Sequence, residues 1–249
     1  MSINVAVLGS NGRMGSESIK AISSTADLEL VAALDLGDSL ESLVTSGTQV
    51  IVDFTHPDSV MTNLEFAINH GIHVVVGTTG FDDAKLAKLE TWLASNPTVG
   101  VLIAPNFGLG AVLMMQFAAS AAKYFESVEI IELHHPNKVD APSGTATRTA
   151  QLITAARRSV NKAPMPDATT TSLAGSRGVK VGEVPIHSVR LRGLVAHQEV
   201  ILGDTGETLT IRHDSMDRTG FMPGVLLGVR QVTSHPGLTF GLEHFMDLA

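Results

Sequence analysis

The 249-residue sequence contains no cysteine, which excludes disulfides, thiolate metal sites and cysteine nucleophiles and fits a reducing compartment. Redox chemistry in such a chain would need a bound cofactor. Lysine and arginine number only 17, form no dense cluster and leave a formal net charge of −8, so we expect no nucleic-acid or anionic-membrane surface. The longest apolar stretch, residues 110–122, is too short to span a bilayer, and the N-terminus lacks a signal-peptide pattern. We therefore expect a cytoplasmic protein.

Hydrophobic residues make up 44% of the chain and charged residues 17%, which is enough to bury one large core or two modest ones. The first hundred residues alternate between short apolar runs and amphipathic segments of helical length, such as the one bounded by Pro57 and Gly71. Near-continuous apolar strands separated by helices indicate an α/β fold with a parallel sheet covered on both faces. The five expected strands are residues 3–9, 28–35, 50–54, 73–77 and 99–105.

Beyond Asn106 the pattern changes, and the later strands are joined by short turns that contain glycine. Such turns favour an antiparallel sheet in a second domain, and the last helix could return to the first domain. The expected elements are a helix at 110–125, a strand at 127–135, a helix at 143–159, a loop at 163–182, strands at 186–193, 196–203 and 207–214, and a helix at 221–232.

The run VAVLGSNGRMG places Gly9, Gly12 and Gly15 between a buried strand and a helix. Backbone amides at that helix N-terminus could approach a pyrophosphate without obstruction from Cβ atoms, which predicts a dinucleotide-binding turn. Asp35 ends the second strand twenty residues after Gly15, where a carboxylate can accept hydrogen bonds from ribose hydroxyls. The alternatives are an ordinary tight turn and an ordinary aspartate at a strand end.

Two further loops, GTTG at residues 77–80 and APNFGLG at residues 104–110, follow the fourth and fifth expected strands. Ligands of doubly wound sheets lie outside the carboxyl ends of the strands, so both loops are expected to border the cofactor. Without that context, each is simply a turn.

The segment IELHHPNKVDAPSGTA, residues 131–146, has the highest density of titratable groups. Along a strand, His134 and His135 should point in opposite directions, so one could meet the reacting atoms of a substrate, and Lys138 adds a compact positive charge. The alternatives are surface histidines in a solvated loop or a zinc site. Because no cysteine and no suitably spaced third ligand are present, we expect no metal.

The end of this segment, APSGTA, predicts the start of a helix. Ser143 can cap it, and the free amides of Gly144 and Thr145 lie at its positive end, where they could bind a carboxylate. Four polar residues on the later strands either line the same cleft or belong to a solvated sheet face. They are Arg190, Arg192, His197 and Glu199.

Taken together, GSNGRMG, GTTG, APNF and ELHHPNKVDAPSGTA resemble the dihydrodipicolinate reductase family of bacterial lysine and diaminopimelate synthesis, over essentially the whole chain. The resemblance implies a Rossmann-type dinucleotide-binding domain at residues 1–108 plus 218–249. It also implies an inserted α+β domain at residues 109–217, with a mixed or antiparallel sheet, that binds substrate and joins a homotetramer. The implied reaction is the NAD(P)H-dependent reduction of a cyclic imine that carries two carboxylates.

The resemblance also implies roles for individual residues. His134 and Lys138 fall on the catalytic positions. The substrate-binding positions are His135, Ser143, Gly144 and Thr145. The cofactor-binding positions are Gly9, Ser10, Asn11, Gly12, Arg13 and Met14 in the glycine turn, Asp35 after the second strand, Gly77, Thr78 and Thr79, and finally Ala104, Pro105, Asn106 and Phe107.

The choice between NADH and NADPH depends on the residues near Asp35. Many relatives have a basic residue directly after this acid, whereas this chain has Leu36, and Asp38 adds further negative charge. Only Arg13 is placed where a guanidinium could reach a 2′-phosphate. We therefore expect dual cofactor use, with NADH used at least as well as NADPH.

Two other functions are compatible with the glycine turn alone. One is another nicotinamide-dependent amino-acid dehydrogenase, of the aspartate or homoserine type, which would not need the HHPNK and SGT segments together. The other is a regulatory module that binds a nicotinamide nucleotide without chemistry, against which the histidine and lysine cluster argues.

Overall fold

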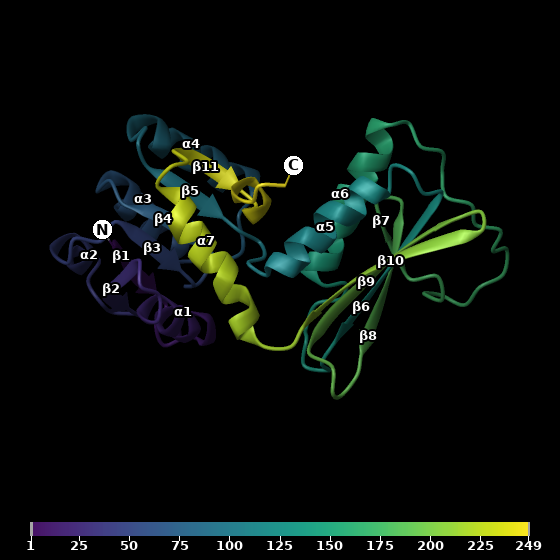
Figure 1. Cartoon of the computed structure of the whole chain (residues 1–249), viewed down its shortest axis with the longest axis horizontal. Helices are drawn as coiled ribbons and strands as arrows, with labels where there is room; N and C mark the ends of the chain where they lie inside the picture. Colours follow the sequence, from purple (N-terminus) through teal and green to yellow (C-terminus); the bar gives the residue numbers. More distant parts are fainter. Residues whose placement is uncertain (1, 249) are drawn as a thin grey trace. The chain divides into compact units, whose positions relative to one another are not determined.

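A computed structural model describes residues 2–248, which form two compact units. The chain of the first unit runs to Leu109 and resumes at Arg218, and the second unit is Gly110–Asp217. Each unit has its own sheet (Figure 1). Among the described residues, no helix combines the length and the apolar character that crossing a membrane requires.

The sheet of the first unit has six parallel strands in the order β11-β5-β4-β3-β1-β2. The five strands expected from the apolar runs are confirmed. The sixth strand, β11, was not predicted, because it has four residues and no fully buried one, so no apolar run marks it. The strands are β1 (Ile3–Leu8), β2 (Leu28–Leu34), β3 (Val50–Asp53), β4 (His73–Val76), β5 (Gly100–Ile103) and β11 (Gly237–Phe240).

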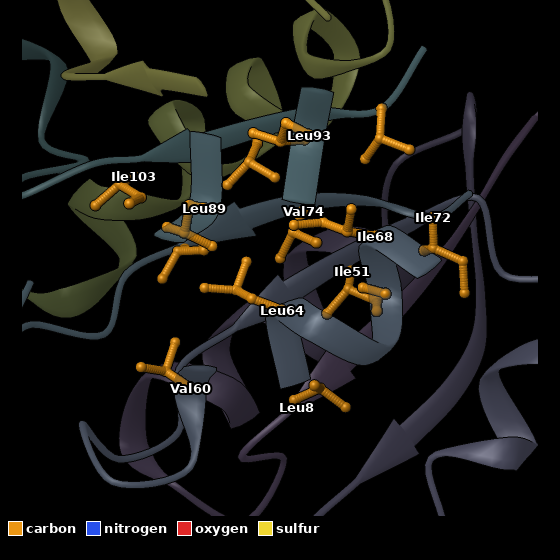
Figure 2. Packing of buried hydrophobic residues seen from close by; sticks show 14 of the residues in the cluster. Leu8, Ile51, Val60, Leu64, Ile68, Ile72, Val74, Leu89, Leu93 and Ile103 are labelled. Carbon is orange, nitrogen blue, oxygen red and sulfur yellow. The ribbon is translucent and has the colours of Figure 1, made fainter. Parts of the chain in front are cut away.

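Helices cover both faces of this sheet, as the continuous apolar strands require. Leu64 and Leu89 of two helices pack on one face against Ile51 and Val74, as Figure 2 shows. On the other face, the helix that contains Gly228 approaches the strands closely. The helices are α1 (Arg13–Ser23), α2 (Glu41–Thr45), α3 (Val60–Asn69), α4 (Asp83–Ser95) and α7 (Met222–Val232), with 3₁₀ helices η1 (Arg218–Phe221) and η2 (Leu242–Phe245).

The second unit has a mixed sheet of five strands in the order β10-β9-β6-β8-β7. Strands β9 and β10 form the expected hairpin, and β8 runs parallel to β6. One expectation was wrong, because β8 and β9 are not neighbours and β6 lies between them. The elements are β6 (Ser127–His134), β7 (Val179–Val181), β8 (Val184–Arg190), β9 (Ala196–Asp204) and β10 (Glu207–Ser215), with helices α5 (Leu109–Ala121) and α6 (Gly144–Ser159).

The connection through α6 explains this strand order. A crossover of β6, α6 and β8 places β8 parallel to β6, as helical crossovers do. The outer edge of β8 then pairs with β7, a strand that the sequence suggested was loop. Strand β9 therefore pairs with the other edge of β6.

Helix α6 packs on one face of this sheet and is anchored at its far end by a buried arginine. Ala146, Ala150 and Ile153 are fully buried. The guanidinium of Arg157 is also buried and donates hydrogen bonds to the carbonyl oxygens of Phe125 and Ala163 at 2.9 Å. Helix α5 ends at Ala121, before the expected end at residue 125, and the chain after it provides one of these carbonyls.

Candidate active site

The glycine turn of the first unit brings the end of β1 against the start of α1. Gly9 has φ of 78°, a conformation that favours glycine, and Gly12 donates a backbone hydrogen bond to the Gly9 carbonyl. A Cβ atom on Gly15 would lie 2.0 Å from that carbonyl oxygen. Gly12 is the N-cap of α1 and no side chain caps this end of the helix. The amides of Gly9 to Gly12 donate hydrogen bonds within the protein, whereas those of Arg13 and Met14 lie in the first turn of α1, so these two amides fit a pyrophosphate group.

Asp35 lies beside this turn, directly after β2. Its carboxylate accepts hydrogen bonds from the backbone amides of Leu36 and Asn11, both at 2.7 Å. These bonds hold the pKa of Asp35 below its usual value, so the side chain is ionised at neutral pH. Asp38 binds the Asp35 amide at 2.8 Å, and the Leu36 side chain is fully exposed. Arg13 is exposed in the glycine turn.

A buried carboxylate at the end of β3 fixes the GTTG loop. Asp53 is fully buried and accepts hydrogen bonds from the hydroxyls of Thr55 at 2.7 Å and Thr78 at 3.0 Å, and from the Asn63 amide at 2.9 Å. Thr79 is exposed, and a Cβ atom on Gly77 would overlap the Phe54 ring. Asp53 was not predicted, although a charged residue at the end of an apolar strand is a usable sign of this role.

The loop after β5 lies next to the GTTG loop, because β4 and β5 are paired in parallel. Ala104 and Phe107 are buried, and the Phe107 ring packs edge-on against Phe54 at 5.7 Å between ring centres. The Asn106 side chain accepts a hydrogen bond from Gly108 at 2.8 Å, which orders the start of α5. Pro105 is exposed. Three segments thus end at the carboxyl edge of the sheet, where a dinucleotide binds in such folds.

In the second unit, His134 ends β6 and contacts a carboxylate two residues earlier. Its Nδ1 lies 2.5 Å from Oε2 of Glu132, because residues i and i+2 of a strand share a face. Burial, together with the charges of Lys138 and Arg190, holds the pKa of His134 below its usual value, although Glu132 acts in the opposite direction. His135 follows the end of the strand and is exposed, so strand alternation does not fix its direction.

Glu132 was not predicted as a site residue, yet it joins His134, Arg190 and Ser143. Its side chain is fully buried and accepts hydrogen bonds from Nη1 and Nη2 of Arg190, at 2.8 and 2.9 Å. It also accepts a hydrogen bond from the backbone amide of Ser143 at 3.2 Å. The sequence does carry a signal for this role. Val128 and Ile130 set an alternation along β6 that predicts an apolar residue at position 132, where the chain has a charged one.

The loop between β6 and α6 carries the lysine. Lys138 forms an ion pair with Asp140 at 2.7 Å, and the Asp140 carbonyl accepts a hydrogen bond from Arg190 at 2.7 Å. At the start of α6, the Ser143 hydroxyl accepts a hydrogen bond from the Ala146 amide at 3.2 Å, as the expected cap. Space beside Gly144 is open. Thr145 follows it in the first turn.

Of the four polar residues that the sequence left open, Arg190 joins this cluster. His197 pairs with Leu133 across the strands and therefore faces the opposite side of the sheet, where its Nδ1 lies 2.6 Å from Asp214. Glu199 lies on that same side and contacts Arg212. Arg192 is exposed after β8.

These features define a class of protein. The first unit has a parallel sheet and a helix that begins at a glycine turn without a side-chain cap. The second unit carries a histidine, a lysine and a helix N-terminus. This combination is typical of a nicotinamide-dependent oxidoreductase that acts on a small anionic substrate.

Comparisons with known proteins identify the family. Residues 3–107 match the N-terminal part and residues 110–246 the C-terminal part of dihydrodipicolinate reductase. The 4-hydroxy-tetrahydrodipicolinate reductase of Streptomyces griseus is 65% identical over 246 residues, which cover 99% of this chain and 98% of that protein. The enzyme of Nocardia farcinica is 61% identical over 248 residues, a share of 100% of each chain after rounding. The chain belongs to the dihydrodipicolinate reductase family.

Solved structures agree with this result. The dipicolinate-bound dihydrodipicolinate reductase of Paenisporosarcina sp. TG-14 is 40% identical and superposes with a TM-score of 0.88, covering 99% of this chain and 100% of that one. An amine dehydrogenase of Mycobacterium smegmatis, 12% identical with a TM-score of 0.64 over 96% of this chain and 95% of that one, shares the fold.

The expected fold class, family and enzyme class are therefore confirmed. The chain functions as a 4-hydroxy-tetrahydrodipicolinate reductase, an NAD(P)H-dependent oxidoreductase of lysine and diaminopimelate biosynthesis. This result decides against the amino-acid dehydrogenase and the non-catalytic sensor.

The close approach in the glycine turn is testable. We expect Gly15→Ala to weaken NADH binding and to lower the free energy of unfolding by about 1–3 kcal/mol, because the new Cβ cannot fit against the Gly9 carbonyl without moving α1. Chemical denaturation and a fluorescence titration measure the two effects. Gly220→Ala is the matched control, because Gly220 has open space around it. Equal behaviour of the two variants would contradict this packing.

Proposed function

We propose that His134 and Lys138 carry the acid chemistry of the reduction. NAD(P)H, when bound, supplies the hydride for the conjugated ring of the cyclic imine, and a proton must also be added. The observation that carries this proposal is the bond between Nδ1 of His134 and the buried Glu132, which leaves Nε2 for the substrate. Lys138 stabilises the charge that develops on the nitrogen-containing system.

The start of α6 is proposed to hold a substrate carboxylate. The amides of Gly144 and Thr145 lie in the first turn of a 16-residue helix, at its positive end, and Ser143 caps that turn. Arg190 donates hydrogen bonds to Glu132 and to the Asp140 carbonyl and so connects β6 with the loop before α6. We place His135 at another part of the same substrate, because it is exposed directly after His134.

The cofactor is proposed to bind across the glycine turn and the loops after β4 and β5. Residues Gly9 to Met14 would line the pyrophosphate, with the amides of Arg13 and Met14 in the first turn of α1 as its donors, and Asp35 would accept the ribose hydroxyls. The loops from Gly77 to Thr79 and from Ala104 to Phe107 would contact the nicotinamide half. The fixed backbone of the first of these loops, bound to Asp53 through Thr78, supports this assignment.

Substitution of the two proposed catalytic residues tests their roles. We expect His134→Gln and Lys138→Ala each to reduce kcat by about 10²- to 10⁴-fold, while NADH binding stays near native. The assay supplies the condensation product of pyruvate and aspartate semialdehyde and follows nicotinamide absorbance. His187→Gln and Lys180→Ala are matched controls on β8 and β7. Near-native turnover in either test variant would remove that residue from the proposal.

We further propose that NADH is used at least as well as NADPH. Asp35 is ionised beside the turn, and a 2′-phosphate at 4 Å from it would be repelled by about 1 kcal/mol in water and by more where water is excluded. Leu36 offers no compensating charge.

Replacement of Asp35 tests the cofactor proposal. We expect Asp35→Ser to shift the kcat/KM ratio towards NADPH, because the change removes the repulsion and keeps a hydroxyl group. Asp38→Ser, at the neighbouring acid whose carboxylate accepts a hydrogen bond from the Asp35 amide, is expected to shift the ratio less, because it leaves the charge of Asp35 in place. Steady-state kinetics with both cofactors provide the ratios. A native enzyme that prefers NADPH by tenfold, about 1.4 kcal/mol, would refute the proposal.

A homotetramer joined through the sheets of the second unit is also proposed. Helix α6 packs on one face of this sheet, whereas Ile131 and Ile201 on the other face remain partly exposed. We expect sedimentation velocity to give the mass of four chains, and Thr210→Arg, on β10 within that face, to lower it. Thr91→Arg on α4 is the control. A native monomer would refute the proposal.

A further inference from the structure

Glu132 is a buried carboxylate at a strand position where an apolar side chain would be sufficient for packing. Its neighbours on the same face of β6, Val128 and Ile130, are apolar and buried. A carboxylate in such surroundings is costly unless donors surround it. Donors reach both oxygens of Glu132: Arg190 Nη2 and the Ser143 amide reach Oε1, and Arg190 Nη1 and His134 Nδ1 reach Oε2. The Ser188 side chain is a further donor.

These donors keep Glu132 ionised. Burial acts to raise the pKa of this carboxyl, but the hydrogen bonds from Arg190, Ser188 and His134 outweigh it and hold the pKa below its usual value. An ionised carboxylate only accepts hydrogen bonds. The His134 nitrogen at 2.5 Å must therefore be the donor, which assigns a proton to Nδ1.

We propose that Glu132 is a positioning residue, which fixes the ring of His134 with its proton on Nδ1 and so makes Nε2 the atom that delivers a proton to the substrate. This inference rests on the proposed acid role of His134. In the step itself, the Nε2–H bond of the imidazolium breaks and its electron pair stays on nitrogen. The proton bonds to the substrate, and the neutral ring keeps the Nδ1–H bond to Glu132.

Arg190 adjusts the strength of this interaction. The charged groups around His134 are Glu132 on β6, Arg190 on β8, and Lys138 and Asp140 in the following loop. Arg190 and Lys138 act against the imidazolium, whereas Glu132 favours it. Replacing Glu132 and replacing Arg190 should therefore change the pKa of His134 in opposite directions.

The test is a pH titration of the His134 ring by NMR in the full-length protein with labelled histidine. Glu132→Gln, which is nearly isosteric, is expected to lower the pKa of His134, and Arg190→Gln is expected to raise it. Glu129→Gln is the matched control, because Glu129 also binds a histidine and an arginine, His187 and Arg177, but lies on the opposite face of β6. It should leave the pKa of His134 unchanged.

Kinetics provide the second readout. Because the protonated ring is the proton donor, kcat/KM falls as the pH rises through the pKa of His134. This fall should move to lower pH in Glu132→Gln and to higher pH in Arg190→Gln. We also expect kcat of Glu132→Gln to be lower by about 10- to 100-fold, the effect of removing the carboxylate that orients a metal-binding histidine, because the orienting hydrogen bond is of the same kind.

The outcomes separate this inference from the proposed function. A His134 pKa that is the same in Glu132→Gln, Arg190→Gln and native protein would overturn the positioning role, whatever the turnover. If Glu132→Gln does not fold, the upward change in Arg190→Gln is the deciding result. Near-native turnover of His134→Gln, by contrast, would overturn the acid role itself and leave the ring measurements unaffected.

Discussion

The ionised carboxylate of Glu132 is the constraint on which the second unit's site depends. A buried charge is stable only when its hydrogen-bonding capacity is filled, and here the donors come from β6, β8 and the start of α6. The end of each element must therefore stay in place for the others to remain paired. Arg190 extends the network to the Asp140 carbonyl, so the loop that carries Lys138 is held as well.

The first unit uses a related arrangement with different partners. Asp53 is also fully buried at the end of a strand, and its partners are neutral hydroxyl and amide groups rather than an arginine. Its bond to Thr78 fixes the loop after β4, while the glycine turn is fixed by direct contact between backbones. In both units, a buried carboxylate at or near the end of a strand takes part in hydrogen bonds that anchor a neighbouring loop.

The separation of these two arrangements between the two units suits a reaction with a hydride donor and an anionic substrate. Binding of a dinucleotide requires backbone amides without nearby side chains, which glycines at a helix N-terminus provide. The proposed proton transfer uses a histidine with a defined tautomer, which a buried carboxylate provides. The residues proposed for the two tasks lie beside separate sheets.

The sequence by itself determined the local features of this protein. Neighbouring residues specify the strands β1 to β5, the glycine turn and the helix that begins after Ser143. The sequence motifs also identify the family and its activity. Only the tertiary structure decided which distant residues meet. Glu132 and Arg190 are 58 positions apart, and they touch because the crossover through α6 places β8 beside β6. The same crossover leaves the other edge of β6 to β9, and the register of that pairing puts His197 opposite Leu133, on the face away from His134. Local patterns specify strands and helices, whereas pairing between strands depends on which edges the rest of the chain leaves free.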